Sequence, residues 1–418
     1  MPDITSITRF LQEFNLIEGK QTSLFDEKLK HTHLKCLNLE GYSTNLFINE
    51  FWTARQRQSS SIQEISYRAC FKPQLPRFFI KLLTGPGEIV YDPFAGRGTT
   101  PLEAALLDRL VISNDVNPLS RILSEPRLDV PSIDEIKQRL FEIPLHVKVN
   151  PSLDLSMFYH PQTETELLNL RNYFIERKDN GEEDSTDRWI KMIATNRLTG
   201  HSKGFFSVYT MPPNQAVSAE RQKKINFQRN QKPEYRCVKS LIIKKSLQLL
   251  RNMSNEQLIS LRNASGSAIF LEKKASETEE IASESVSLTV TSPPFLNVVQ
   301  YSEDNWLRGW FNNIDMQNIE QQMTMATSLK EWSSVMSNVF KELYRITRPG
   351  GWVAFEVGEV KGGSIKLEEA VIPLGLNFGF QCIGVVVNQQ DFTKTSNIWG
   401  VKNNQSGTNS NRIVLFTK

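Results

Sequence analysis

The 418-residue sequence has few of the residues that build covalent or metal-dependent sites. Its four cysteines, Cys36, Cys70, Cys237 and Cys382, lie far apart and include no CxxC pair. This spacing argues against a zinc ribbon and against a disulfide framework. The five histidines form no cluster at ligand spacing either. We therefore expect reduced, structural cysteines and no metal.

Long hydrophobic runs and a strong net charge are also missing. No stretch approaches the roughly 18 apolar residues of a membrane helix, and residues 1–20 carry acidic and polar side chains where a signal peptide needs an apolar segment. We expect a cytoplasmic protein without a membrane partner. The 49 Lys and Arg against 46 Asp and Glu leave a net charge of only +3, so any nucleic-acid surface must come from a local concentration of basic residues.

The sequence does have enough apolar residues, 39%, for a large core, and a length typical of two or three domains. Strand and helix patterns alternate over residues 67–123, become helical and basic over 124–260, and return to strands over 261–418. We predict an α/β fold, in which a Rossmann-like sheet is split by an inserted, mostly helical, basic region. Residues 1–66 are expected to pack on the sheet domain. The charged segment 272–284 has no apolar period and is predicted to be a surface loop.

The loop after the first strand of this pattern has the composition of a nucleotide pocket. It reads Asp92-Pro93-Phe94-Ala95-Gly96-Arg97-Gly98-Thr99-Thr100. Its two glycines permit a sharp turn and a close approach of a ligand to the main chain, and the following helix offers unpaired N–H groups. Asp115 ends the next strand, where it can accept hydrogen bonds from both ribose hydroxyls. An ordinary tight turn is the alternative, and the missing third glycine disfavours NAD.

A second segment, Thr291-Ser292-Pro293-Pro294-Phe295, ends a strand on two rigid prolines. Together with residues 67–100 and 113–115, it resembles the S-adenosyl-L-methionine-dependent amino methyltransferases of DNA. The resemblance implies that 67–123 is the cofactor-binding half of a methyltransferase domain and 261–418 the catalytic half. It also implies a cofactor site formed by Asp92, Pro93, Phe94, Ala95, Gly96, Gly98, Thr99, Thr100 and Asp115, with Lys72 near the methionine carboxylate and Ser267 in a third cofactor segment.

The same resemblance gives the proline segment a chemical role. An exocyclic amino group is a poor nucleophile because its lone pair is delocalised into the ring, and acceptors around its hydrogens favour the tetrahedral geometry of attack. Ser292 Oγ and the Pro293 carbonyl would be these acceptors, with Pro294 helping to fix the carbonyl direction. Phe295 would stack on the flipped base. A strand that simply stops at prolines is the alternative.

In this family a Ser before Pro-Pro mostly accompanies methylation of cytosine N4, whereas Asp or Asn accompanies adenine N6 or RNA targets. We therefore predict a site-specific DNA methyltransferase acting on N4 of a flipped cytosine in a restriction-modification or defence system. A cognate restriction endonuclease is a candidate partner. An adenine-N6 DNA or RNA methyltransferase stays open, as does a catalytically inert DNA-binding protein. Cytosine C5 chemistry needs a thiolate, usually a Cys after Pro, and no cysteine here follows a proline.

The insertion 124–260 is the candidate target-recognition region. From Arg221 to Arg251 the sequence has ten Lys or Arg and one acid, Glu234, a bias suited to neutralising phosphates. The preceding residues 199–218 are rich in glycine, aromatics and amides, which suits a loop that enters a groove. A solvated helix face is the alternative for the basic run, and a structural role is the alternative for His201. We predict contacts to double-stranded DNA from His201, Asn214, Gln215, Arg221, Lys223, Lys224 and Arg229.

Overall fold

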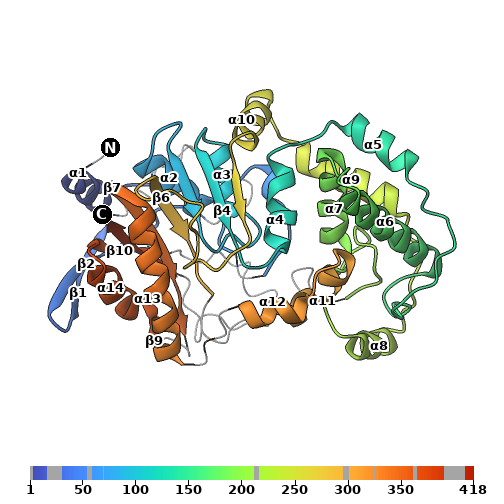
Figure 1. Ribbon diagram of the computed structural model, residues 1–418. Coiled ribbons are helices and arrows are strands. Elements are labelled where there is room, and N and C mark those ends of the chain that lie inside the picture. The colour runs from blue at the N-terminus through green and yellow to red at the C-terminus, as the bar shows by residue number, and fades with distance from the viewer. Residues whose placement is uncertain are drawn as a thin grey trace, which may run out of the picture.

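A nine-stranded sheet, in the order β1-β2-β10-β11-β7-β6-β3-β4-β5, forms the centre of the computed structural model. Figure 1 shows this sheet in one lobe of the molecule and a group of helices in the other. The structure describes residues 3–16, 31–53, 59–68, 70–210, 216–294, 301–323, 326, 328–360, 365–389 and 410–418.

Five strands of the sheet are parallel. They are β3 (Ile89–Asp92), β4 (Leu110–Asn114), β5 (Ile269–Leu271), β6 (Val286–Thr291) and β7 (Thr347–Val357). From β3 the chain steps outward to β4 and β5, and it then returns to the other side of β3 to form β6 and β7. The strand order therefore reverses at β3, and ligands of such sheets bind beyond the carboxyl ends of the strands at the reversal. The predicted Rossmann-like α/β fold is confirmed.

The other edge of the sheet is mixed in direction and includes the N-terminal segment. β11 (Ser410–Thr417) is antiparallel to both β7 and β10 (Gln381–Gln389). β2 (Tyr42–Asn49) pairs parallel to β10, and β1 (His33–Leu39) is antiparallel to β2. Helix α1 (Ile4–Glu13) adds two buried apolar side chains, Ile7 and Leu11, to the core. Residues of the first 66 thus extend the same sheet that holds β3.

Both faces of the sheet are covered by helices, and side chains alternate between two apolar clusters. Trp352 and Ala354 of β7 belong to the cluster that includes α2 (Gln74–Leu83) and α3 (Thr99–Ala105). Val353 and Phe355 belong to the cluster under α13 (Leu329–Ile346) and α14 (Leu367–Asn377). A parallel sheet buried on both faces explains why its strands read as nearly continuous apolar runs. The smaller elements nearby are η2 (Ser61–Gln63), α4 (Leu119–Ser124), η3 (Glu125–Arg127), α10 (Asn255–Ser265), β8 (Glu359–Val360) and β9 (Ile365–Lys366).

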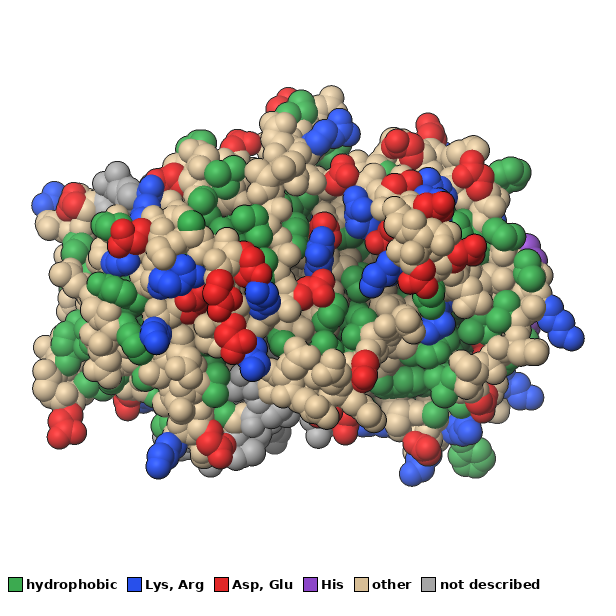
Figure 2. All heavy atoms as spheres, in the orientation of Figure 1, with side chains coloured by type: hydrophobic (Ala, Val, Ile, Leu, Met, Phe, Trp, Pro, Cys, Tyr) green, Lys and Arg blue, Asp and Glu red, His purple; other side chains and the backbone are tan. Residues whose placement is uncertain are grey.

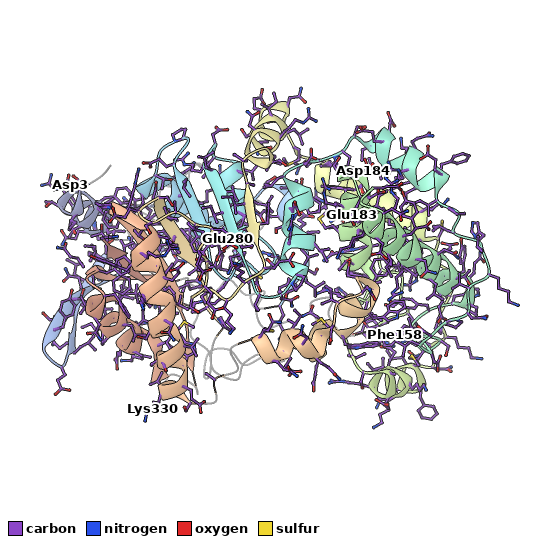
Figure 3. All side chains as sticks on the ribbon, in the orientation of Figure 1. Asp3, Phe158, Glu183, Asp184, Glu280 and Lys330 are labelled. Carbon is purple, nitrogen blue, oxygen red and sulfur yellow. The ribbon has the colours of Figure 1, made fainter. Side chains whose placement is uncertain are left out.

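The helical lobe combines the insertion with two later helices. It contains α5 (Ile133–Glu142), α6 (Pro161–Asp179), α7 (Ser185–Arg197), α8 (Ala219–Gln228), α9 (Val238–Leu250), α11 (Tyr301–Phe311) and α12 (Met316–Gln322). Asp184 and Asp187 form a reciprocal cap at the start of α7 (Figure 3). Arg139 of α5 binds Asp184 at 2.7 Å and Arg177 of α6 binds Asp187 at 3.0 Å. These ion pairs join three helices at one point.

Among the described residues, no helix has both the length and the apolar character needed to cross a membrane.

Candidate active site

A pocket lies beyond the carboxyl ends of β3, β4, β5 and β6, where the strand order reverses. The loops that follow these four strands supply much of its wall. They contribute Pro93, Phe94, Ala95, Gly96 and Thr99 after β3; Asp115, Val116 and Asn117 after β4; Lys273, Lys274, Ala275 and Ser276 after β5; and Ser292 and Pro294 after β6. The rest of the wall comes from Tyr67, Arg68, Cys70 and Phe71 on one side and from Gln322, Met323, Val335 and Val339 on the other. The two predicted motifs, far apart in the sequence, therefore open onto one space.

The glycine loop has the tight backbone that its sequence predicts. Gly96 and Gly98 have φ of +53° and +75°, in the left-handed region that favours glycine. A Cβ on Gly98 would lie 2.3 Å from Cβ of Ser124 in α4. Gly98 is therefore required by backbone conformation and by packing, while Gly96 forms part of the pocket wall.

Asp115 is fixed at the end of the pocket by two main-chain donors. The N–H groups of Gly96 and Asn117 each donate to one of its carboxylate oxygens, both at 2.9 Å. Burial raises the pKa of Asp115 to about 6. A carboxylate has about four lone-pair sites, so these two bonds leave it able to accept two hydroxyl donors.

Asp92 and Thr100 lie beneath the pocket and connect the two motifs. Both side chains are buried. Asp92 Oδ1 accepts from Thr291 Oγ1 at 2.6 Å and from the Phe94 N–H at 3.1 Å, and Thr100 Oγ1 donates to the Val290 carbonyl at 3.1 Å. Burial raises the pKa of Asp92 to about 7. These two predicted cofactor residues thus hold the glycine loop against the end of β6.

The Ser-Pro-Pro segment is held from two neighbouring elements. Trp332 Nε1 of α13 donates to the Pro294 carbonyl at 2.9 Å. The pairing of Thr291 with Phe355 sets Ser292 beside Glu356 at the end of β7, and the nearby hydroxyl acts to lower the pKa of Glu356, against the larger effect of burial. Glu356 is only 7% exposed, and its Oε1 accepts from Asn411 Nδ2 at 2.5 Å. Burial raises the pKa of Glu356 to about 7. Phe295 lies outside the described residues.

Glu356 was missed by the sequence analysis. It is an acid inside the apolar strand GWVAFEV, which is unusual for a buried strand. That anomaly was the available signal, but its meaning depends on the pairing of β6 with β7, which sets Thr291 beside Phe355. The register places Glu356 next to Ser292.

Ser267, predicted to lie in a third cofactor segment, is not part of the pocket wall. Ser267 precedes β5, at the opposite end of that strand from the pocket, and its Oγ is 3.4 Å from the Ala264 carbonyl. Residues 273–276, which follow β5, line the pocket instead. The Asn114 side chain clamps Lys273 there, donating to its carbonyl at 2.9 Å and accepting from its N–H at 3.0 Å. Residues 272–284 form a loop without regular secondary structure, as predicted, but not a simple surface loop, because Ala275, Thr278 and Ile281 are buried.

Lys72 does not belong to the pocket wall in this structure. Its side chain is exposed, whereas its neighbour Phe71 lines the pocket.

The pocket wall that includes Tyr67 and Arg68 continues from a segment whose carbonyls are bound by cationic side chains. Lys245 of α9 donates to the Glu64 carbonyl at 2.8 Å, and Arg308 of α11 donates to the Ser66 carbonyl at 3.1 Å. Arg97 donates to the Ile65 carbonyl at 2.7 Å. Burial lowers the pKa of Lys245 to about 7. Part of the basic run therefore supports the pocket from inside.

The aromatic loop before α8 is also held internally, contrary to the expectation for residues 199–218. Phe205 and Phe206 are buried. Arg236 donates to the carbonyls of Ser202 and Phe205, at 3.2 and 2.8 Å. These aromatic side chains pack inward, so they do not face a groove.

The remaining predicted DNA-binding residues have different surroundings. His201 is exposed at the tip of the loop, and the guanidinium of Arg229 lies 3.8 Å from the centre of the Tyr209 ring. Arg221, Lys223 and Lys224 are exposed on α8. Asn214 and Gln215 lie outside the described residues. Within the part of the chain that the structure describes, no three His, Cys, Asp or Glu side chains gather in a way that could hold a metal ion.

Comparison with known proteins supports the assignment that these motifs suggest. Residues 18–120 match the family model of the N6 and N4 methyltransferases, described as a DNA methylase. The predicted resemblance to the DNA amino methyltransferases is confirmed. S-adenosyl-L-methionine is the methyl donor that this family match supports. The matched residues include the glycine loop and Asp115 but not the Ser-Pro-Pro segment.

Two curated methyltransferases are similar over parts of the chain. The Type II methyltransferase M.MjaII of Methanocaldococcus jannaschii is 31% identical over 77 residues, which are 18% of this chain and 14% of that protein. The Type II methyltransferase M.BsoBI of Geobacillus stearothermophilus is 23% identical over 305 residues, 66% of this chain and 58% of that protein. The chain thus spans less than two thirds of either relative.

Among solved structures, a SAM-dependent methyltransferase from Methanosarcina mazei aligns over 81% of this chain and 96% of its own, with 11% identity and a TM-score of 0.32.

Proposed function

We propose that this chain is a site-specific DNA methyltransferase that transfers a methyl group from S-adenosyl-L-methionine to N4 of a flipped cytosine. The observation that carries the proposal is the shared pocket: the glycine loop and Asp115 open onto the same space as Ser292 and Pro294. A methyl donor and an amino acceptor must meet within about 3.5 Å to react. A single pocket lined by both motifs gives the two groups a shared space in which to meet.

The groups in the pocket fit a nucleoside with an amino-acid tail. The Asp115 carboxylate would accept from the ribose hydroxyls, and the main chain of Ala95 and Gly96 permits close approach. Phe71, Phe94, Val335 and Val339 offer apolar surface for a ring and a methylene chain. When bound, S-adenosyl-L-methionine supplies an electrophilic methyl group on a sulfonium. The chain itself supplies no covalent nucleophile in this proposal.

Ser292 would act on the target amino group. Its Oγ accepts one N–H and favours the tetrahedral geometry in which the nitrogen lone pair is free to attack. The N–C bond forms as the S–C bond breaks, and the nitrogen must then lose a proton. A hydroxyl that accepts from the amino group needs another partner for its own hydrogen.

We infer that Glu356 is this partner and that it is a positioning residue for Ser292. In its charged form Glu356 accepts the Ser292 O–H, which turns the Oγ lone pairs toward the amino group. It also gives the departing proton a destination, because Ser292 can pass its own proton to Glu356 while taking one from nitrogen. Asn411 donates to Oε1 of Glu356 and so holds its carboxylate plane. The protonated form of Glu356 would compete by donating to Ser292.

The assignment of cytosine rests on Ser292 before Pro-Pro, and the assignment of DNA rests on the family match. Two relatives named Type II methyltransferases support a restriction-modification or defence context. An adenine-N6 DNA or RNA methyltransferase keeps the same pocket and differs in the base. An inert DNA-binding protein would have no use for a hydroxyl aligned by a buried carboxyl group.

The test is incubation of the full chain with unmodified plasmid DNA and S-adenosyl-L-methionine, followed by digestion to nucleosides and mass spectrometry. The proposal predicts N4-methylcytosine with the wild type and none above background with Ser292→Ala. N6-methyladenine would overturn the choice of base. Cofactor binding without any modified base in plasmid DNA would contradict the proposed activity.

A further inference from the structure

Helix α8 has the most exposed large apolar side chain recorded among the described residues. Phe227 is 89% exposed. Leaving a whole aromatic ring in water is unfavourable relative to burying it. Single exposed apolar side chains are common on protein surfaces, so the surroundings of Phe227 decide whether it marks a binding surface.

The side chains around Phe227 are cationic. Lys223 and Lys224 precede it by four and three residues, so they lie one turn away on the same side of the helix. Arg221, Arg229 and Lys232 are also exposed, and the one acid between residues 219 and 232 is Glu220. The partner that this surface fits is therefore anionic and also offers flat apolar rings.

The inner side of α8 is firmly attached, so its outer side has a fixed direction. Gln222 is fully buried and donates to the Tyr209 carbonyl at 3.0 Å, and Asn226 donates to the Met157 carbonyl at 2.8 Å. The buried Phe158 lies close to α8 and α11 (Figure 3). Figure 2 shows side chains projecting from the corner of the molecule over α8, at the lower right.

The chain just before α8 is tied to the wall of the pocket. The Ala216 N–H donates to the Asp304 carbonyl at 2.7 Å, and Trp306 Nε1 donates to the Val217 carbonyl at 3.1 Å. The Asp304 carboxylate binds Arg68, which lines the pocket, at 2.5 Å. The ten residues of α8 span about 15 Å, comparable to the rise of four or five base pairs. The contacts through Asp304 and Arg68 join the start of α8 to the pocket wall.

A second exposed aromatic side chain, Phe141, lies in surroundings that do not suit DNA. Phe141 of α5 is 82% exposed, but its helix carries Asp134, Glu135 and Glu142 as well as Lys137 and Arg139. Arg139 is bound to Asp184 and Asp187. Lys137 is bound to Asp134 at 3.1 Å. Figure 1 places α5 and α8 on opposite sides of the helical lobe. Phe141 therefore has neither the cationic surroundings nor the connection to the pocket.

We infer that α8 is a DNA-contacting helix in which Phe227 packs against the bases of the duplex while Lys223 and Lys224 bind the flanking phosphates. An apolar side chain can wedge into a base step and unstack it partly. Unstacking a neighbouring step would lower the energy needed to flip the target. This inference rests on the proposed function, and it assigns to α8 the groove-facing role that was predicted for the loop at residues 199–218.

The experiment measures the binding of the full chain, with S-adenosylhomocysteine present, to a fluorescein-labelled mixed-sequence DNA duplex over a range of salt concentrations. Phe227→Ala is expected to bind about tenfold more weakly with an unchanged salt slope, because it loses stacking and no charge. The double variant Lys223→Gln, Lys224→Gln should lose about 2 from the slope of log K against log salt. Phe141→Ala is the matched control and should bind like the wild type.

The variant Phe227→Trp separates contact with bases from a purely structural effect. It should bind DNA like the wild type, and the fluorescence of the new tryptophan should be quenched or shifted when DNA is added. The inference is overturned if Phe227→Ala binds DNA within twofold of the wild type, or if Phe141→Ala weakens binding equally. Neither outcome bears on the proposed function, which the methylation activity of the wild type tests separately. If Phe227→Ala loses binding to an RNA duplex while its binding to the DNA duplex is unaffected, the surface is assigned to RNA and the choice of DNA is overturned. A wild type that binds neither duplex would refute the proposed function itself.

Discussion

The two lobes use polar residues in opposite ways. In the sheet lobe, Asp115 and Ser292 stand at strand ends and face a pocket. In the helical lobe, Lys245, Arg236 and Arg308 point inward and bind main-chain carbonyls. Loops without secondary structure have carbonyls that need donors when they are buried, and long cationic side chains supply them. A basic composition alone therefore does not indicate a surface for DNA, because only exposed cations, such as those on α8, are available to bind phosphates.

The largest predicted effect is the loss of methylation rate on replacing Ser292 at a strand end of the sheet lobe, because its hydroxyl is proposed to act in the transition state. Ser292→Ala should lower the single-turnover rate roughly 100-fold, a typical loss for one aligned transition-state contact. The dissociation constant for S-adenosylhomocysteine should stay within threefold of wild type. Rapid-quench assays and isothermal calorimetry measure the two quantities. An equal change in both would assign Ser292 to the fold of the pocket.

The next effect concerns Glu356, whose pKa is raised to about 7. If the charged form orients Ser292, the methylation rate should rise as pH increases through 7, because that is where Glu356 loses its proton. Glu356→Gln should be about tenfold slower at pH 8 and should not show this rise. The buried Glu342, held by Thr278 and Arg345 away from Ser292, is the control position. A Glu342→Gln variant that flattens the profile equally would contradict the role.

A smaller effect distinguishes the inward cations from the outward ones. Lys245→Met should lower the stability of the protein, while Lys224→Gln should leave stability unchanged and reduce the salt dependence of DNA binding. The pKa of Lys245 is lowered to about 7, so between pH 7 and 10 the unfolded chain binds more protons than the folded one. The stability of the wild type should therefore gain from this group as pH rises through that window.

Lys245→Met removes that gain, on the order of a few kcal/mol at most. Chemical denaturation at pH 7 and pH 9 measures the difference. A Lys224→Gln variant that changes the pH dependence of stability, with Lys245→Met showing none, would reverse the assignment of the two lysines.

Local spacing was enough to predict the part of the site that follows β3 and β4. Asp92 to Thr100 and Asp115 belong to one βαβ unit, whose geometry sets where each strand end lies. Ser292 was found from its chemistry, since two prolines after a buried strand are unusual. The alignment of both motifs then follows from β3 and β6 being neighbours, with Val90 beside Leu288.

The parts that were missed depend on long-range register or on burial. Ser267 was placed by its likeness to a short motif, whereas the residue after a strand, here Lys273, is the one that reaches the pocket. Glu356 lies beside Ser292 because β6 and β7 are neighbours, and Asn411 binds Glu356 because β7 and β11 are neighbours. No local sequence pattern encodes these pairings. Nor does composition tell whether a lysine such as Lys245 turns toward a buried carbonyl or toward solvent.

The central claim is that the strand-end residues around one pocket bind the cofactor. Its most direct test is calorimetric titration of S-adenosylhomocysteine into the variants Asp115→Ala and Ser267→Ala. Asp115→Ala should weaken binding at least tenfold, because it loses hydrogen bonds to a charged acceptor worth roughly 1.5–3 kcal/mol each, and Ser267→Ala should bind like the wild type. Weak binding by Ser267→Ala together with wild-type binding by Asp115→Ala would contradict the account.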